Sequence, residues 1–351
     1  MADNKDKPFH YGGQAVIEGV MMRGRKDFAV AVRRADGEIV STREDIRSIL
    51  GKLKWLDKPF LRGTLALVDA LVLGIKALKY SANIAMEDAV AADAESKAAD
   101  AQSDALESAD DPQTESGAAK NDAEPKNRRV NDLTVGIMMV LGLALGVGLF
   151  FFLPIVITKP LKSALSGWQL TATEGAIKIS LFLAYVLLIS LMRDIRRVFQ
   201  YHGAEHKTIN AYEAKAPLTV ENVKDYTKVH VRCGTSFVLV VLVTSIIVFM
   251  VVVEPLPYGS LSNPNAISYL MRFLYKLALL PFVAGIAYEV IRFAGNRKDW
   301  VLTRIVLVPG LLMQKITTRE PEPEMIEVAI KSLESVLERE ASEGETQVAA
   351  V

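Results

Sequence analysis

Long, uninterrupted apolar runs in the second half of the chain dominate its pattern of hydrophobic and polar positions. An α-helix rises about 1.5 Å per residue and the hydrocarbon layer of a bilayer is about 30 Å thick, so roughly 17 to 25 apolar residues can cross it. Four runs are of this length: Leu133–Thr158, Ala176–Met192, Thr235–Val253 and Met271–Phe293. A fifth stretch, residues 301–316, is shorter and contains Pro309 and Gly310, so an interfacial or re-entrant segment is expected there. This pattern predicts a mainly α-helical membrane protein with four transmembrane helices.

Shorter alternating segments near the start of the chain indicate β-structure. Residues 28–34 (FAVAVRR) and 37–43 (GEIVSTR) flank a turn at residues 35–37 and predict a β-hairpin. Residues 12–24 (GGQAVIEGVMMRG) predict one further strand between glycine-containing turns. We therefore expect a small N-terminal β-containing (α+β) cytoplasmic domain before the spans.

Two other segments have apolar residues at helical spacing. Residues 60–80 are apolar except at Arg62, Asp69 and Lys76, which recur every seven residues and therefore share one helix face. We expect an amphipathic helix there that lies on the membrane or packs on the spans. A second amphipathic helix is expected in the tail, where one helical face carries Ile326, Ile330, Leu333 and Leu337.

Residues 87–127 consist mainly of Ala, Asp, Glu and Ser. A segment with so few large apolar side chains cannot bury a core, so a disordered acidic linker is expected, with partial helix as the alternative that its alanines allow. The expected order is a cytoplasmic region 1–86 with the hairpin and the amphipathic helix, the linker 87–127, a transmembrane region 128–316 with a histidine-containing cytoplasmic loop 193–234, and a cytoplasmic helix and tail 317–351.

Arginine and lysine are distributed unevenly around the predicted spans. Arg128 and Arg129 precede the first span, three arginines lie within residues 193–197 after the second, and the connection 254–266 contains neither Lys nor Arg. The positive-inside rule then places both termini and the 193–234 connection in the cytoplasm. Lys159 and Lys162, in the first outer connection, weaken this orientation without reversing it.

The charge balance of the whole chain bears on its partners. The 41 basic and 41 acidic residues cancel to a net charge of zero, so bulk electrostatics gives no support to a nucleic-acid partner. Membrane lipids are the expected partners. The single cysteine, Cys233, excludes an internal disulfide and fits a reducing compartment.

Three of the four histidines lie in the 193–234 connection. His202, Glu205 and His206 form an H-x-x-E-H pattern, in which two histidines four positions apart share one face of a helix and can reach one metal ion. Glu205, beside them, is the candidate general base toward a metal-bound water. His230 and Cys233 follow in HVRCGTSF, and both residue types are ligands of zinc. The sequence therefore predicts a site for zinc or another divalent metal.

Three alternatives remain for these residues. An open catalytic site would use two or three histidines and a carboxylate and keep one position for water, whereas a closed structural site would use His202, His206, His230 and Cys233 together. The third alternative is a histidine cluster without metal. We rank His230 above Cys233 as a direct ligand, because a thiolate there would tend to close the site.

Glu289 lies near the cytoplasmic end of the fourth predicted span. A carboxylate so close to lipid needs a cationic partner. Either Glu289 joins the histidines as a metal ligand or it pairs with Arg292. We expect Glu289 to converge on the histidine site.

Several long motifs of this chain resemble the YqhQ-like family of bacterial membrane proteins. They are GGQAVIEGVMMRG, RG-x-x-x-L from Arg62, YHGAEHK, HVRCGTSF and PGLLMQKITTREP. The family is a domain-of-unknown-function group described as predicted metal-dependent enzymes, and the resemblance implies a multi-pass protein of the bacterial cytoplasmic (inner) membrane. The expected function is a zinc-dependent hydrolase at the cytoplasmic membrane face. The alternative is a non-enzymatic scaffold or interaction protein, with unidentified protein partners and a structural metal or none.

Overall fold

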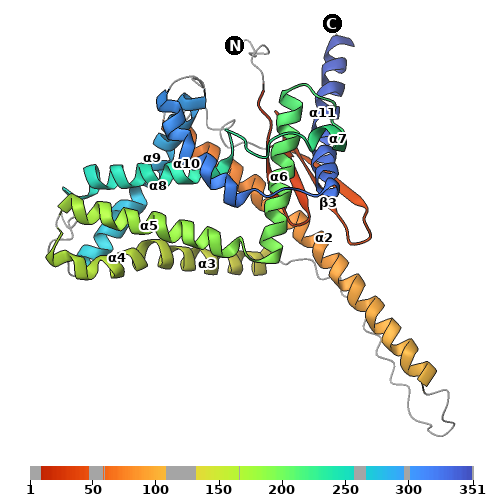
Figure 1. The fold of residues 1–351 in the computed structure, drawn as a ribbon, viewed down its shortest axis with the longest axis horizontal. Helices are drawn as coiled ribbons and strands as arrows, with labels where there is room; N and C mark the ends of the chain where they lie inside the picture. Colours follow the sequence, from red (N-terminus) through yellow and green to blue (C-terminus); the bar gives the residue numbers. More distant parts are fainter. Residues whose placement is uncertain are drawn as a thin grey trace.

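The chain folds into an elongated body of apolar helices with a β-sheet and its covering helices at one end (Figure 1). The computed structural model describes residues 9–46, 58, 60–107, 132–165, 167–256, 266–295 and 301–349.

The sheet has four antiparallel strands in the order of the chain: β1 (Gly12–Val16), β2 (Gly19–Arg23), β3 (Asp27–Arg33) and β4 (Ile39–Asp45). The predicted hairpin corresponds to β3 and β4. The prediction of one strand over residues 12–24 is wrong, because the chain reverses after Val16 and Gly19 pairs back onto it. Glu18 makes this turn at a φ of 50°, and its carboxylate accepts two hydrogen bonds from Arg197 at 2.5 and 2.6 Å. A partner 179 residues away thus holds the turn, which local sequence does not reveal.

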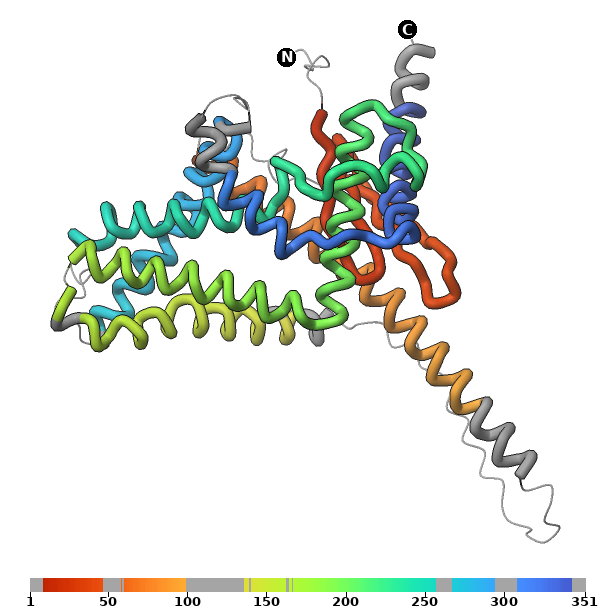
Figure 2. The backbone as a smooth tube through the Cα atoms, in the orientation of Figure 1, coloured from red at the N-terminus to blue at the C-terminus, as the bar shows by residue number. Residues whose placement is uncertain are grey.

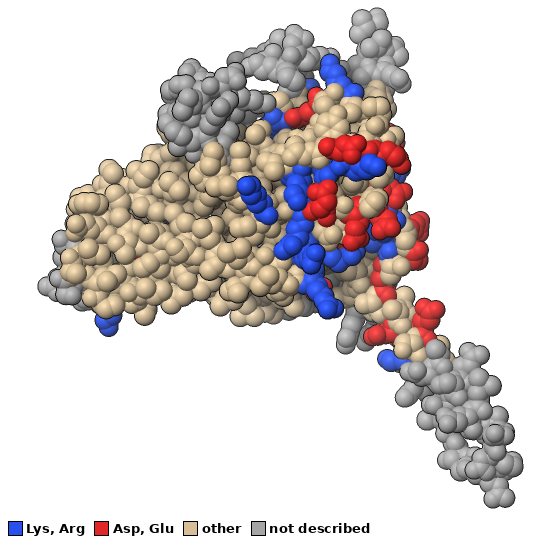
Figure 3. Space-filling view, in the orientation of Figure 1, with Lys and Arg blue, Asp and Glu red and all other residues tan. Residues whose placement is uncertain are grey.

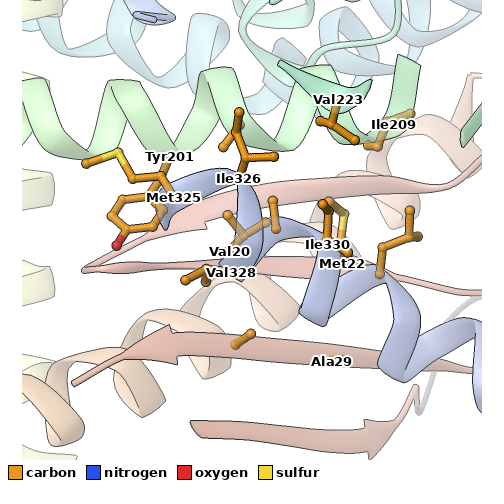
Figure 4. Packing of buried hydrophobic residues seen from close by; sticks show 14 of the residues in the cluster. Val20, Met22, Ala29, Tyr201, Ile209, Val223, Met325, Ile326, Val328 and Ile330 are labelled. Atoms are coloured by element: carbon orange, nitrogen blue, oxygen red, sulfur yellow. The ribbon is translucent and has the colours of Figure 1, made fainter. Parts of the chain in front are cut away.

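Helices cover both faces of the sheet. On one face, α6 (Arg193–Glu213) and α11 (Pro323–Ala349) bury Val20, Met22 and Ala29 under Tyr201 and Ile326 (Figure 4). Each large apolar side chain buried in this way contributes about 1.5–3 kcal/mol. The short helix α7 (Val220–Val223) adds Val223 to the same core. The N-terminal sheet, the histidine region and the C-terminal tail, which the sequence suggests are separate, therefore share one core.

The other face of the sheet packs on α2 (Leu61–Glu107), where Leu73 and Ala77 contact the strand residues of a second core. The amphipathic helix expected at 60–80 is thus part of α2, which packs on the sheet and on α9 (Ala266–Gly295). Asp69 is buried at 5% exposure and Lys76 donates to a carboxylate of β4.

Helix α2 also runs about twenty residues into the segment expected to be a disordered linker. Its residues 89–98 are exposed, and this part projects away from the rest of the molecule (Figure 1). Alanine has the highest helix propensity, so an alanine-rich segment can stay helical without burying a face. The expected linker is therefore helical as far as Glu107, and residues 108–131 lie outside the described part of the chain.

Within the part of the chain that the structure describes, four helices are long and apolar enough to cross a membrane: Gly136–Leu161, Gly167–Ile189, Gly234–Val253 and Ile267–Phe293. They overlap the four predicted spans, although the second begins at Gly167 and not at Ala176, and they form the elongated body (Figure 2). Figure 3 shows that the visible face of this body carries almost no charge, whereas Lys, Arg, Asp and Glu gather around the sheet. The elements are α3 (Asp132–Val147), a π-helical turn η3 (Gly148–Phe152), α4 (Leu153–Thr158), a 3₁₀ turn η4 (Lys159–Ser163), α5 (Gly167–Ile189), α8 (Gly234–Val248), a second π-helical turn η5 (Phe249–Val253) and α9 (Ala266–Gly295).

The fifth apolar stretch is a helix, α10 (Val301–Thr317), that contains Pro309. It packs on α8 so closely that a Cβ on Gly310 would lie 2.4 Å from the Ser236 Cβ atom. The end of α10 therefore reaches the start of α8, where the candidate site lies.

Candidate metal centre

The H-x-x-E-H residues lie on α6, so the first half of the expected loop 193–234 is a helix. Gly203, inside the motif, is unfavourable in a helix by its propensity alone. A Cβ at this position would lie 2.1 Å from the Arg319 carbonyl oxygen, so the glycine permits the chain after α10 to cross the helix. As the spacing predicts, His202 and His206 share a face, with ring centroids 4.4 Å apart.

Cys233 reaches the same point from the start of α8, where it is the N-terminal capping residue. Its Sγ lies 3.2 Å from His202 Nε2. One candidate ligand atom from each of His202, His206 and Cys233 lies within 4.8 Å of the other two. Two imidazoles and a thiol thus converge, from segments about thirty residues apart.

Two backbone carbonyls set the orientation of the imidazoles. His202 Nδ1 lies 2.8 Å from the Thr317 carbonyl oxygen, and His206 Nδ1 lies 2.7 Å from that of Lys228. A carbonyl oxygen only accepts, so each Nδ1 carries a hydrogen, and in the neutral ring Nε2 is then the nitrogen with the free lone pair. Carbonyl partners of this kind orient the histidine ligands of metal sites.

Glu205 is buried beside this group. Its Oε2 lies 3.9 Å from His202 Nε2, and the backbone N–H of Gly13 in β1 donates to its carboxylate. A Cβ on Gly13 would lie 2.9 Å from Glu205 Cγ, so a larger residue in β1 would displace the acid. Burial raises the pKa of Glu205, while His202 and the Gly13 N–H oppose that shift.

His230 lies at the edge of the site and outside the close group. Its ring centroid is 5.7 Å from that of His206, and its Nε2 lies 3.8 Å from Glu213 Oε2. Gln314 fixes its backbone by accepting from the His230 N–H at 2.9 Å and donating to its carbonyl at 2.8 Å. Cys233 therefore belongs to the close group and His230 does not, whereas the sequence ranks His230 first.

Glu289 does not converge on the histidines. Its two carboxylate oxygens accept hydrogen bonds from Arg62 of α2, each at 2.7 Å. This corrects the expected convergence: the cation that the carboxylate needs comes from α2, because Arg62 lies on the helix face that packs on α9. Glu289 thus has the cationic partner that its position requires, and this partner is Arg62.

The close group opens into a cavity of about 420 Å³. Its walls come from β1, α2, α6 and the start of α8, and they include His230 and Glu205. Among the lining residues that the sequence did not single out are Gly13, Gln14, Ala70, Arg232 and Thr235. All of them except Ala70 lie in the motifs GGQAVIEGVMMRG and HVRCGTSF, but no local pattern shows that these segments meet, because they are far apart in the chain.

Comparisons with known proteins are consistent with the motif resemblance. A family described as "Protein of unknown function (DUF1385)" matches residues 58–339. The "Uncharacterized protein YqhQ" of Bacillus subtilis (strain 168) is 33% identical over 345 residues, which cover 97% of this chain and 96% of the relative. No solved structure matches the chain. The chain belongs to the DUF1385 family.

Proposed function

We propose that this protein is a multi-pass membrane protein with a zinc-dependent hydrolase site where its sheet domain meets the apolar helices. The observation that carries the proposal is the convergence of His202, His206 and Cys233, with both imidazoles oriented by backbone carbonyls. Two nitrogens and one sulfur suit zinc, and three protein ligands leave a fourth tetrahedral position.

One pair of the candidate ligand atoms already has a separation close to that of a zinc site. Zinc binds nitrogen at about 2.0–2.1 Å and sulfur at about 2.3 Å, so tetrahedral ligand atoms lie roughly 3.3–3.8 Å apart. The 3.2 Å separation of His202 Nε2 and Cys233 Sγ is close to that range. A zinc ion in such an open site supplies Lewis acidity and activates water near neutral pH.

Glu205 and the cavity supply the other requirements of hydrolysis. The Glu205 carboxylate lies within 4 Å of His202 Nε2, so it is placed to accept a proton from a water at the fourth position. The Gly13 N–H holds this carboxylate toward the site. The cavity of about 420 Å³ gives a substrate access to the same point.

The four long apolar helices support placement in a membrane, and the uneven distribution of Lys and Arg supports a cytoplasmic location for the sheet domain. In a bacterium this membrane is the cytoplasmic (inner) membrane. The site would then act on substrates at the cytoplasmic membrane face.

Metal analysis of the purified full-length chain tests the zinc site. We expect about one zinc per chain in the wild type and in Glu205→Gln, and a loss of at least tenfold in affinity in His202→Ala and Cys233→Ala. His10→Ala is the control, since His10 lies outside the close group. Wild-type protein that binds no divalent metal would overturn the proposal and favour the non-enzymatic scaffold.

A metabolite and lipid comparison tests hydrolysis itself. A strain with Glu205→Gln as its only copy should accumulate the same compound as a deletion strain, because this variant keeps its metal and loses the proton acceptor. A strain with Glu205→Gln that matches the wild type, beside an altered deletion strain, would assign the protein a scaffold role with a structural metal.

A further inference from the structure

A cluster of ionisable side chains lies inside the apolar body, away from the histidine site. Glu174 and Lys178 come from α5, Arg272 and Lys276 come from α9, and Glu254 follows η5. Except for Glu254, each is at most 7% exposed. Charged side chains at membrane depth are costly and usually mark a functional site.

Hydrogen bonds join the cluster across three helices. The Arg272 guanidinium donates to Glu174 at 3.1 Å and to Glu254 at 3.2 Å, and Lys276 donates to the other oxygen of Glu174. Lys178 Nζ lies 5.0 Å from the centre of the Phe151 ring. The two carboxylates thus lie among three basic side chains.

The sequence around the cluster also contains more basic than acidic residues. Residues 133–192 and 234–288 contain five Lys or Arg residues and two acidic residues, Glu174 and Glu254. Lys159, one of the five, is exposed at the end of α4. An anion bound beside Arg272 and Lys276 would bring the local charge closer to neutral.

A cavity of about 390 Å³ lies against this cluster. Arg272, Lys276 and Lys159 provide its polar side, while Phe151, Phe152 and Val156 belong to its apolar wall. Phe152 is 54% exposed and Val156 is 63% exposed, so the wall continues onto the surface of the body. In the proposed membrane placement, that surface faces lipid chains.

We propose that this cavity binds an anionic lipid, with its phosphate group at Arg272, Lys276 and Lys159 and an acyl chain along the wall of Phe152 and Val156. Lysine and arginine recognise phosphate through charge and hydrogen bonds, and apolar walls accept the chain. This inference rests on the membrane placement in the proposed function, and it does not depend on the metal site.

Native mass spectrometry of the full-length protein tests this inference. The protein is released from nanodiscs that contain equal amounts of phosphatidylglycerol and phosphatidylcholine with the same acyl chains. We expect the wild type to retain phosphatidylglycerol at least fivefold over phosphatidylcholine. Lys159→Gln should lower that preference several-fold, and Lys159→Arg should keep it.

A pair of tryptophan substitutions separates lipid binding from a purely structural role of the cluster. Val156→Trp fills the cavity without removing a charge, whereas Leu145→Trp adds the same side chain at an exposed position (74%) outside the cavity. Only Val156→Trp should abolish the preference. Equal retention of both lipids, equal behaviour of the two tryptophan variants, or full displacement of phosphatidylglycerol by millimolar inorganic phosphate would each refute the lipid site. Failure of the protein to enter nanodiscs would instead refute the membrane placement.

Discussion

At the scale of single residues, close backbone approaches explain positions that appear unfavourable in the sequence. Gly203 weakens α6 by its propensity, yet it allows the Arg319 carbonyl to pass over the helix beside His202. Gly13 leaves room for the Glu205 side chain, because a Cβ on Gly13 would lie 2.9 Å from Glu205 Cγ. These glycines set how closely the segments around the site can pack.

Gly203→Ala should lower the free energy of unfolding by about 1–3 kcal/mol, because the added methyl group meets a backbone atom that cannot move aside easily. Gly142→Ala is the matched control, since a Cβ there meets nothing within 4 Å and alanine favours a helix. Denaturant unfolding of both variants in detergent measures the difference. Equal stability of the two variants would show that Gly203 is not tightly packed.

A buried acid in the sheet gives the protein a pH-dependent stability. Asp27 is 1% exposed, and burial raises its pKa although Arg43 and Arg339 lie 3.9 and 4.0 Å away. A raised pKa in the folded state means that ionisation costs stability, so the cost is absent below about pH 4 and grows as the pH rises through the folded pKa. Glu340 also faces Asp27 and raises its pKa further.

Asp27→Asn should therefore raise the thermal midpoint at pH 7, with a gain that shrinks as the pH falls toward 4. Thermal unfolding of the full-length protein at several pH values measures this trend, with the exposed Asp225→Asn as control. A gain that is constant with pH would contradict the assignment to Asp27 ionisation.

The sequence predicts the positions of site residues where neighbours along the chain decide them. The four-residue spacing of His202 and His206 is a property of one helix, so their shared face could be predicted. The carbonyl that orients His202 comes from Thr317, 115 residues along the chain, and no local pattern carries that contact. The sequence ranks His230 above Cys233, whereas the structure places Cys233 in the close group, because Gln314 of α10 holds the His230 backbone at the edge of the site.

At the scale of elements, α2 connects the sheet domain to the apolar body. It packs on the sheet through Leu73 and Ala77 and binds α9 through the Arg62–Glu289 pair. Bidentate arginine–carboxylate pairs have fixed geometry, so this pair sets how α2 lies on α9.

Arg62→Glu and Glu289→Arg should each lower the free energy of unfolding by about 1–3 kcal/mol, because each leaves two like charges facing across the helix interface. The double variant Arg62→Glu/Glu289→Arg should recover most of the loss. Denaturant unfolding of the four proteins forms a complete cycle. Additive losses in the double variant would mean that the two residues do not interact.

The apolar pattern predicts the start of α8 to within one residue, whereas α5 begins at Gly167, before the predicted start at Ala176, because its first two turns contain polar residues. The start of α2 agrees with the predicted helix 60–80, but its extension to Glu107 was less accessible, since an alanine-rich acidic sequence suits either a solvated helix or a disordered chain. The β1–β2 turn was missed because Glu18 takes a left-handed conformation that local sequence assigns to glycine.

At the scale of the whole molecule, three distant parts of the chain form one domain around the sheet. The face of α11 that carries Ile326, Ile330 and Leu333 was predicted, but its partner, the N-terminal sheet, was not. Amphipathic patterns show which face is buried and carry no information about the surface that covers it. The histidine site lies where this domain meets the apolar helices.

The proposed membrane placement predicts that the two ends of the α8 segment lie on opposite sides of the membrane. Lys215, after α6, and Pro255, after η5, lie beyond opposite ends of the segment that contains α8. In a Cys233→Ser background, Lys215→Cys should react with an impermeant maleimide only after the cells are opened, whereas Pro255→Cys should react in intact cells. Reaction of both positions from the same side would contradict the four-span arrangement.

X-ray absorption at the zinc edge of the full-length protein tests the central claim, the His202–His206–Cys233 centre, most directly. The geometry predicts one sulfur at about 2.3 Å and three nitrogen or oxygen atoms at about 2.0–2.1 Å, two of them in imidazole rings. The sulfur contribution should disappear in Cys233→Ser. A bound zinc with no sulfur ligand in the wild type, or with all four positions filled by protein side chains, would contradict the open site.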